Sequence, residues 1–111
     1  MELATKQLKR ADVVHIAGRV DSSTAPALEK VLKEIMQQGR FHIVVDMENL
    51  QFISSAGLRV LISTAKATRR WNRGDLLLAS LPPHIQDTFK LAGLTAVFKI
   101  FPDTVEAVGN F

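Results

Sequence analysis

Cysteine is absent from the 111 residues of this sequence, which excludes disulfides, thiolate metal sites and cysteine nucleophiles. No apolar run approaches the roughly 18–20 residues that a membrane-spanning helix needs. The N-terminal stretch MELATKQLKR lacks the apolar segment of a secretory signal. With no mark of an oxidising compartment or of a membrane, we expect a cytoplasmic protein with no membrane partner.

A strong excess of one charge sign is also missing. Fourteen Lys and Arg residues stand against eleven Asp and Glu residues, which leaves a net charge of +3. Nucleic-acid binding usually needs a clustered basic face, so this balance argues against nucleic acid as a partner. The hydrophobic share of 47% and the length fit one domain with one core over residues 1–111.

Repeats and Pro/Gly-rich linkers are absent as well, and apolar periodicity alone divides the chain. Strands are predicted at Leu3–Lys9, Val13–Ala17, Phe41–Asp46, Asp75–Ala79 and Ala96–Ile100. Helices are predicted at Thr24–Gln38, Ser55–Trp71, Pro82–Ala92 and Asp103–Val108. The order β-β-α-β-α-β-α-β-α predicts an α/β fold whose mixed, mostly parallel sheet is flanked by helices, with the opening hairpin as an antiparallel edge.

The most informative stretch is DMENLQFISSAGL, from Asp46 to Leu58. It reads as the end of a buried strand, a connection, and two serines at the start of a helix. Either Ser54 or Ser55 can cap that helix, because a serine oxygen accepts a free backbone N–H there. The same helix end tolerates an added anion. A serine at this place can be an ordinary cap, a nucleophile or a phosphorylation site.

The signs of catalysis are weak. A nucleophile elbow around Ser55 needs glycine two residues before it, and Ile53 occupies that position. His15 and His42 fall inside predicted strands, where packed structural histidines are the more common case. No histidine pair has metal-ligand spacing, and no Gly-rich phosphate loop is present, so we expect no catalytic residues, no metal and no cofactor.

Two acidic residues follow predicted strands. Asp21 lies in the loop before the first helix, and Asp46 ends the central strand. Both are expected at the C-terminal side of the sheet, where ligands gather in α/β folds. On its own, each is an ordinary helix cap or solvated loop residue. It becomes a candidate functional residue only if the fold brings it close to Ser55.

The second helix carries a basic stripe. Arg59, Lys66, Arg70 and Arg73 superpose at 3.6 residues per turn, with Ser55 one turn before Arg59. A solvated helix face and a positive docking surface explain this pattern about equally well. Trp71 lies off the apolar face, and we expect it to cover the edge of the core.

The chain resembles the STAS domain, specifically the small bacterial anti-sigma-factor antagonists, over essentially its whole length. The resemblance rests on Ile16–Asp21, on Ile43–Asp46, on Phe52–Leu58, and on Phe101–Ala107. The family pattern is Asp-Ser-Ser/Ala-Gly-Leu with the first serine phosphorylated. Matching backward from Gly57 places the phosphoacceptor at Ser55 and puts Ser54 where the family has aspartate, while Asp21 matches a loop acid of the family.

The resemblance implies a binding protein, not an enzyme. Its partner would be an anti-sigma factor that is also a serine kinase, which phosphorylates Ser55 and so releases the antagonist, and a serine phosphatase would reset the switch. Besides Ser55, the residues expected at the partner interface are Asp21, Ser22, Ser54, Gly57, Leu58 and Arg59.

Other functions stay open at this point. A non-switching STAS subunit of a stress-signalling or lipid-transport assembly would have the same fold. A basic domain that binds nucleic acid or an anionic surface would use the stripe from Arg59 to Arg73. An esterase-like enzyme is the most distant alternative.

Overall fold

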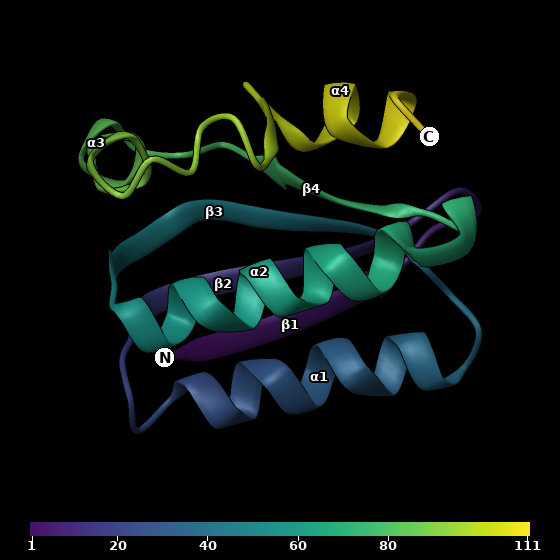
Figure 1. Ribbon diagram of the computed structural model, residues 1–111, viewed down its shortest axis with the longest axis horizontal. Helices are drawn as coiled ribbons and strands as arrows, with labels where there is room; N and C mark the ends of the chain where they lie inside the picture. Colours follow the sequence, from purple (N-terminus) through teal and green to yellow (C-terminus); the bar gives the residue numbers. More distant parts are fainter.

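The computed structural model describes all residues, 1–111, and its centre is a five-stranded sheet in the order β1-β2-β3-β4-β5. The strands are β1 (Glu2–Gln7), β2 (Asp12–Val20), β3 (His42–Ile53), β4 (Asp75–Ala79) and β5 (Lys99–Phe101). The helices are α1 (Ala25–Gln37), α2 (Ser55–Arg69), α3 (Pro83–Leu91) and α4 (Thr104–Gly109), and a short 3₁₀ turn, η1 (Arg70–Asn72), follows α2. The predicted order of strands and helices is confirmed (Figure 1).

The sheet is mixed, as the sequence predicts. β1 pairs antiparallel with β2, and the four strands from β2 to β5 run parallel to one another. Each parallel pair is joined through a helix, which is the connection that parallel strands require. The antiparallel edge is therefore the opening hairpin, and the fold class is α/β as expected.

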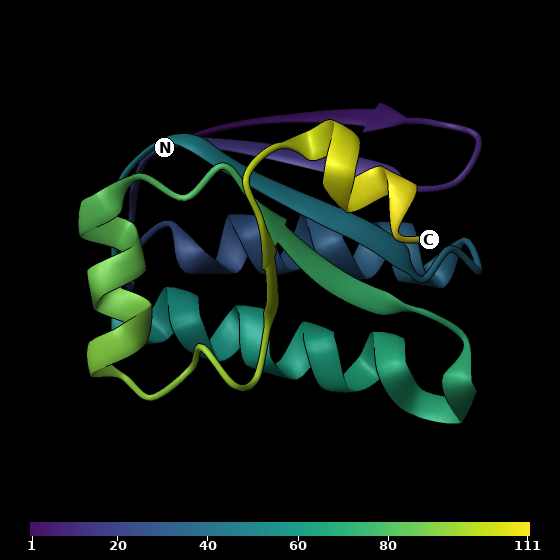
Figure 2. The same cartoon turned by 90° about the horizontal axis from the view of Figure 1, so that it is seen from above.

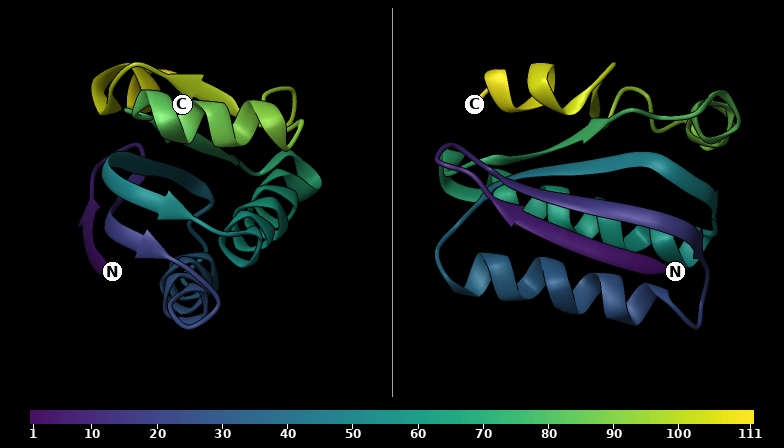
Figure 3. Two further views of the ribbon diagram at one scale, coloured as in Figure 1. Left: turned by 90° about the vertical axis from the view of Figure 1, so that its left-hand side faces the viewer. Right: turned by 180° about the vertical axis from the view of Figure 1, so that it is seen from behind.

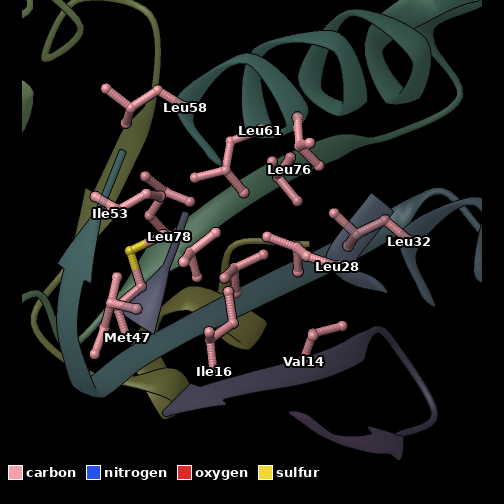
Figure 4. Packing of buried hydrophobic residues seen from close by; sticks show 14 of the residues in the cluster. Val14, Ile16, Leu28, Leu32, Met47, Ile53, Leu58, Leu61, Leu76 and Leu78 are labelled. Atoms are coloured by element: carbon pink, nitrogen blue, oxygen red, sulfur yellow. The ribbon is translucent and has the colours of Figure 1, made fainter. Parts of the chain in front are cut away.

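Helices cover both faces of the sheet unequally (Figures 1 and 3). α1 and α2 lie side by side on one face, over a cluster of 22 buried hydrophobic residues. Figure 4 shows this cluster between β3, β4 and the two helices, with Leu28 of α1 and Leu61 of α2 among its members. α4 lies on the opposite face over a smaller cluster of six residues. α3 runs across the end of the sheet where α1 and α2 begin (Figure 2).

Two strands are longer than predicted. β2 continues through Gly18 to Val20, and β3 continues from Asp46 to Ile53, where a loop and a connection were expected. The polar residues Glu48, Asn49 and Gln51 hide the continuation in the sequence, but Met47, Leu50 and Ile53 are buried in the main cluster. β5 begins later than predicted, at Lys99, because residues 96–98 form a turn and a bend and not part of the strand.

The end of α2 also differs from the prediction. The helix stops at Arg69, and Trp71 has a left-handed backbone with φ of 63° in the following turn. Trp71 is 78% exposed, so the expectation that it covers the core edge is wrong. The basic stripe is shorter for the same reason: Arg73 lies beyond the turn, and its guanidinium stacks 3.7 Å from the centre of the Phe41 ring.

Candidate functional site

Two helix starts meet at one edge of the sheet. β2 and β3 are parallel neighbours, and Val20 is paired with Ile53 at their last residues. Each strand leads into a helix through a short connection, so the loop Asp21–Thr24 and the start of α2 lie beside each other (Figure 3, left). The Ser54 N–H donates to the Val20 carbonyl oxygen at 2.8 Å and ties the two connections together. This edge is the candidate site.

Ser54 and Ser55 have different roles at the start of α2. Ser54 has extended backbone (φ −86°, ψ 173°) and is the N-cap, since its Oγ accepts from the Gly57 N–H at 3.4 Å. Ser55 is the first residue of the helix, is exposed, and its hydroxyl makes no hydrogen bond within the protein. The sequence left the cap open between the two serines, and the structure assigns it to Ser54. The Ser55 hydroxyl is therefore free.

The surroundings of Ser55 favour negative charge. Free N–H groups and the positive end of the helix dipole stand at its position. The first turn of α2 holds no acidic residue, and its last turn carries Lys66 and Arg69. A negative group on Ser55 therefore meets no acidic side chain from the first turn of its own helix.

Gly57 and Leu58 hold the helix start against the sheet. A Cβ at Gly57 would lie 2.7 Å from side-chain carbons of both Ile53 and Val20, so only glycine permits this approach. Leu58 is 9% exposed and belongs to the main core cluster. Both residues thus fix the place of Ser55 rather than present a broad surface of their own.

Asp21 organises the loop on the other side of the edge. Its Oδ1 accepts from the Ser23 hydroxyl at 2.6 Å, from the Ser23 N–H at 3.0 Å and from the Thr24 N–H at 3.2 Å. The bond from the Ser23 side chain, followed by the backbone bonds, lowers the pKa of Asp21 below its ordinary value of 3.8. The carboxylate therefore accepts its hydrogen bonds within the turn before α1 and forms none with Ser55. Ser22, between Asp21 and Ser23, is exposed.

Charged and aromatic groups surround this edge. Arg59 is exposed one turn after Ser55 and forms no salt bridge. Arg19 and Phe52, paired across β2 and β3, are a contact that the sequence did not reveal: the guanidinium lies 4.4 Å from the ring centre, and Phe52 is 38% exposed. The sequence could have predicted this contact only from the pairing register of β2 and β3. Both residues lie in parts of these strands that the sequence did not predict.

Asp46 lies elsewhere, against the prediction. It is in the middle of β3, seven residues before Ile53, and so about 20 Å from the candidate site along the strand. Its carboxylate is buried and contacts His15 Nδ1 at 2.6 Å. The prediction that Asp46 ends the central strand is therefore wrong, and Asp46 does not lie near Ser55.

The histidines lie in the predicted elements but are not packed in the core. The His15 side chain is 45% exposed beside Asp46, and His42 is exposed and stacks on Phe111 at 4.5 Å between ring centres. His84 of α3 contacts the Gln51 carbonyl oxygen at 2.9 Å. No group of three or more His, Asp or Glu side chains is placed to hold a metal ion. No helix has both the length and the apolar character to cross a membrane.

Comparison with known proteins now places the chain. A model of the STAS domain matches residues 2–107. BtrV of Bordetella bronchiseptica, assigned to the anti-sigma factor antagonists, is 33% identical over 111 residues, which cover 100% of this chain and 95% of BtrV. The anti-sigma-B factor antagonist of Staphylococcus aureus is 33% identical over 81 residues, covering 73% of this chain and 74% of that protein.

Solved structures agree with the fold. The anti-sigma factor antagonist SpoIIAA in its unphosphorylated form superposes with a TM-score of 0.82 at 18% identity, covering 98% of this chain and 95% of that one. The phosphorylated form of SpoIIAA from Bacillus gives a TM-score of 0.76 at 17% identity, covering 98% of each chain. The domain model and the relatives at 33% identity show that the chain belongs to the STAS domain family, among the anti-sigma factor antagonists.

Proposed function

We propose that this protein binds an anti-sigma factor with serine-kinase activity through the edge where α1 and α2 begin, and that phosphorylation of Ser55 ends the binding. The observation that carries the proposal is that the two adjacent serines have different structural roles. Ser54 caps the helix, which leaves Ser55 exposed with a free hydroxyl. The names of the relatives support the partner class, because BtrV and the staphylococcal protein are both named as anti-sigma factor antagonists.

The physical chemistry supports a switch at this place. A phosphoryl group adds about −1.5 to −2 charge and three acceptor oxygens at neutral pH. At the first residue of α2 those oxygens meet free backbone N–H groups, so the modified fold keeps its stability. The same charge inside a fitted protein interface must be desolvated and repels acidic partner groups. Phosphorylation thus leaves the fold intact and disrupts the interface.

The proposed contact surface surrounds Ser55. Ser22 and Arg59 present exposed side chains, and Ser54 is half-buried as the N-cap of α2. Asp21 acts by shaping the loop that carries Ser22, and Gly57 and Leu58 act by holding the start of α2 in place. Phe52, partly exposed, extends this surface with an apolar contact.

The proposed partner exchange also bears on catalysis, on a second enzyme partner and on the location of the protein. A protein that works by exchanging partners needs no catalytic residue, so we infer a binding module and not an enzyme. A serine phosphatase that removes the phosphoryl group from Ser55 would restore binding. Anti-sigma factors act on the transcription machinery, so we place the protein in the cytoplasm.

The test is phosphate mapping with the cognate kinase. The protein and its Ser54→Ala and Ser55→Ala variants are incubated with the active anti-sigma factor and ATP, and the phosphate is located by mass spectrometry. We expect one phosphate on Ser55 in the wild type and in Ser54→Ala, and none in Ser55→Ala. Phosphate on Ser54 alone would move the site by one residue.

The non-switching STAS subunit is the second candidate. If the cognate kinase, verified to be active, leaves both serines of this protein free of phosphate, the non-switching subunit is favoured over the switch. Binding of the same partner can be measured separately, so loss of the switch and loss of the partner are distinguishable.

A further inference from the structure

A second charged surface lies at the opposite end of the sheet from Ser55. Three connections meet there: residues 8–11 between β1 and β2, residues 38–41 between α1 and β3, and residues 70–74 between α2 and β4 (Figures 1 and 2). We call this surface the basic end. Its cations are Lys9, Arg10, Arg40, Arg70 and Arg73.

A cavity of about 330 Å³ opens between these connections. Four of the cations line it, Lys9, Arg10, Arg40 and Arg73, together with His42. The one carboxylate in the lining is Asp12, and Arg40 already occupies it through two bonds of 2.9 and 3.1 Å. Lys9, Arg10 and Arg73 form no salt bridge, so the cavity carries uncompensated positive charge.

The guanidinium of Arg73 is held in place before any ligand arrives. It stacks 3.7 Å from the centre of the Phe41 ring and donates two hydrogen bonds, of 2.8 and 3.2 Å, to the Ala67 carbonyl oxygen. An arginine has five N–H donors, so others stay free for an anion. Ordering the side chain in advance reduces the entropy that binding must overcome.

The same turn exposes an aromatic anchor. Trp71 is 78% exposed, its backbone is left-handed, and the Arg70 guanidinium lies 5.5 Å from its ring centre. A tryptophan so exposed contributes nothing to the core. Tryptophan and arginine are the residues most enriched where protein interfaces concentrate their binding energy.

We propose that the basic end docks an acidic segment of a partner protein, independently of Ser55. Several charges around one cavity suit a short run of carboxylates beside one apolar side chain. A nucleic-acid site commonly neutralises 6–10 phosphates along a track, which is more than these cations offer. The molecule is 30 Å long, whereas charges in physiological salt are screened over about 8 Å, so a phosphate on Ser55 has little influence at this end.

The test uses a fluorescein-labelled peptide of ten residues, nine glutamates with one leucine among them, and its binding is followed by anisotropy. Lys9→Glu/Arg10→Glu is the main variant, because both side chains are exposed and make no side-chain hydrogen bond whose loss would harm the fold. Lys30→Glu/Lys90→Glu is the matched control: it changes the net charge equally, at exposed sites outside the basic end. Thermal melts confirm that both variants are folded.

We expect the main variant to weaken peptide binding roughly tenfold or more, Trp71→Ala to weaken it several-fold, and the control to change it less than about twofold. Ser55→Asp should leave the affinity unchanged. Absence of measurable peptide binding, or equal losses in the main variant and the control, would overturn the proposal. Tighter binding of a labelled ten-nucleotide oligothymidylate, lost in the main variant, would assign the basic end to nucleic acid instead.

Discussion

At the residue scale, one of the two adjacent serines, Ser54, caps α2, and the other, Ser55, keeps a hydroxyl that is free to be modified. The sequence predicts a serine cap and a free serine at the start of α2 but not which is which, because either hydroxyl can reach a backbone N–H. The choice depends on backbone angles, and Ser54 has the extended conformation of an N-cap. The register taken from Gly57 places the phosphoacceptor on the other residue, the one with the free hydroxyl.

The capping assignment predicts unequal costs for the two alanine variants. Ser54→Ala should lower the free energy of unfolding by about 0.5–1 kcal/mol, the lower part of the usual range because the cap bond is long at 3.4 Å. Ser55→Ala should change it by less than about 0.3 kcal/mol, since alanine suits the first helical turn. Urea unfolding of both variants measures this, and a larger loss in Ser55→Ala would reverse the assignment.

Gly57 is predicted to be intolerant of a side chain. The Cβ of Gly57→Ala would lie 2.7 Å from the buried side chains of Ile53 and Val20. We expect overpacking to outweigh the gain in helix propensity and to destabilise the protein by about 1–2 kcal/mol. Gly109→Ala is the control, because a Cβ there meets nothing within 4 Å. Similar melting temperatures for the two variants would contradict the close approach.

The position of Asp46 could not be predicted from its neighbours in the sequence. A carboxylate after an apolar run predicts a strand end, yet its partner is His15, 31 residues earlier in the chain. Burial of Asp46 is satisfied by a contact that exists only once β2 and β3 are paired. No local pattern contains that information.

At the element scale, order and type were predictable where apolar periodicity and caps agree. α1 with Pro26 in its first turn, and α4 with Asp103 as its N-cap, begin where the sequence places them. β3 was predicted too short because polar residues interrupt its second half, where the buried residues Met47, Leu50 and Ile53 recur at every third position and not at every second one as a strand pattern requires. The end of α2 was predicted too late because periodicity alone does not show the change of backbone angles at Arg70 and Trp71.

The turn before α1 predicts a specific dependence of stability on pH. The hydrogen bonds from Ser23 and Thr24 lower the pKa of Asp21, so its contribution is present above the unfolded value of about 3.8 and is lost as the pH falls through the lower folded value. Asp21→Asn keeps an acceptor oxygen but cannot titrate. Urea unfolding between about pH 6 and pH 2 should show a shallower acid decline for the variant, and parallel curves would exclude this linkage.

At the scale of the whole molecule, the parallel sheet separates two surfaces. The proposed switch lies at the carboxyl ends of β2 and β3, where both helices begin, and the basic end lies at the other extreme of the sheet. The sequence predicted the first surface through a motif and a resemblance. It did not predict the second, because the cations come from three connections that only the fold brings together.

Charge near the switch should govern association with the anti-sigma factor. Arg59→Glu should slow association and change its salt dependence, while the free energy of unfolding changes by less than about 0.5 kcal/mol, since Arg59 is exposed and unpaired. Lys66→Glu is the matched control, about 10 Å farther along the same helix. Stopped-flow kinetics at two salt concentrations compare them, and an equal effect of both would assign the docking role to the helix face as a whole.

The central claim is that a phosphoryl group on Ser55 ends partner binding without harming the fold. The most direct measurement is titration calorimetry of the cognate anti-sigma factor with two forms of this protein, unmodified and fully phosphorylated on Ser55, beside thermal melts of each. We predict that phosphorylation weakens binding by about a hundredfold or more and shifts the free energy of unfolding by less than about 1 kcal/mol. Equal affinity of the two forms, or loss of binding only because the phosphorylated form unfolds, would contradict the claim.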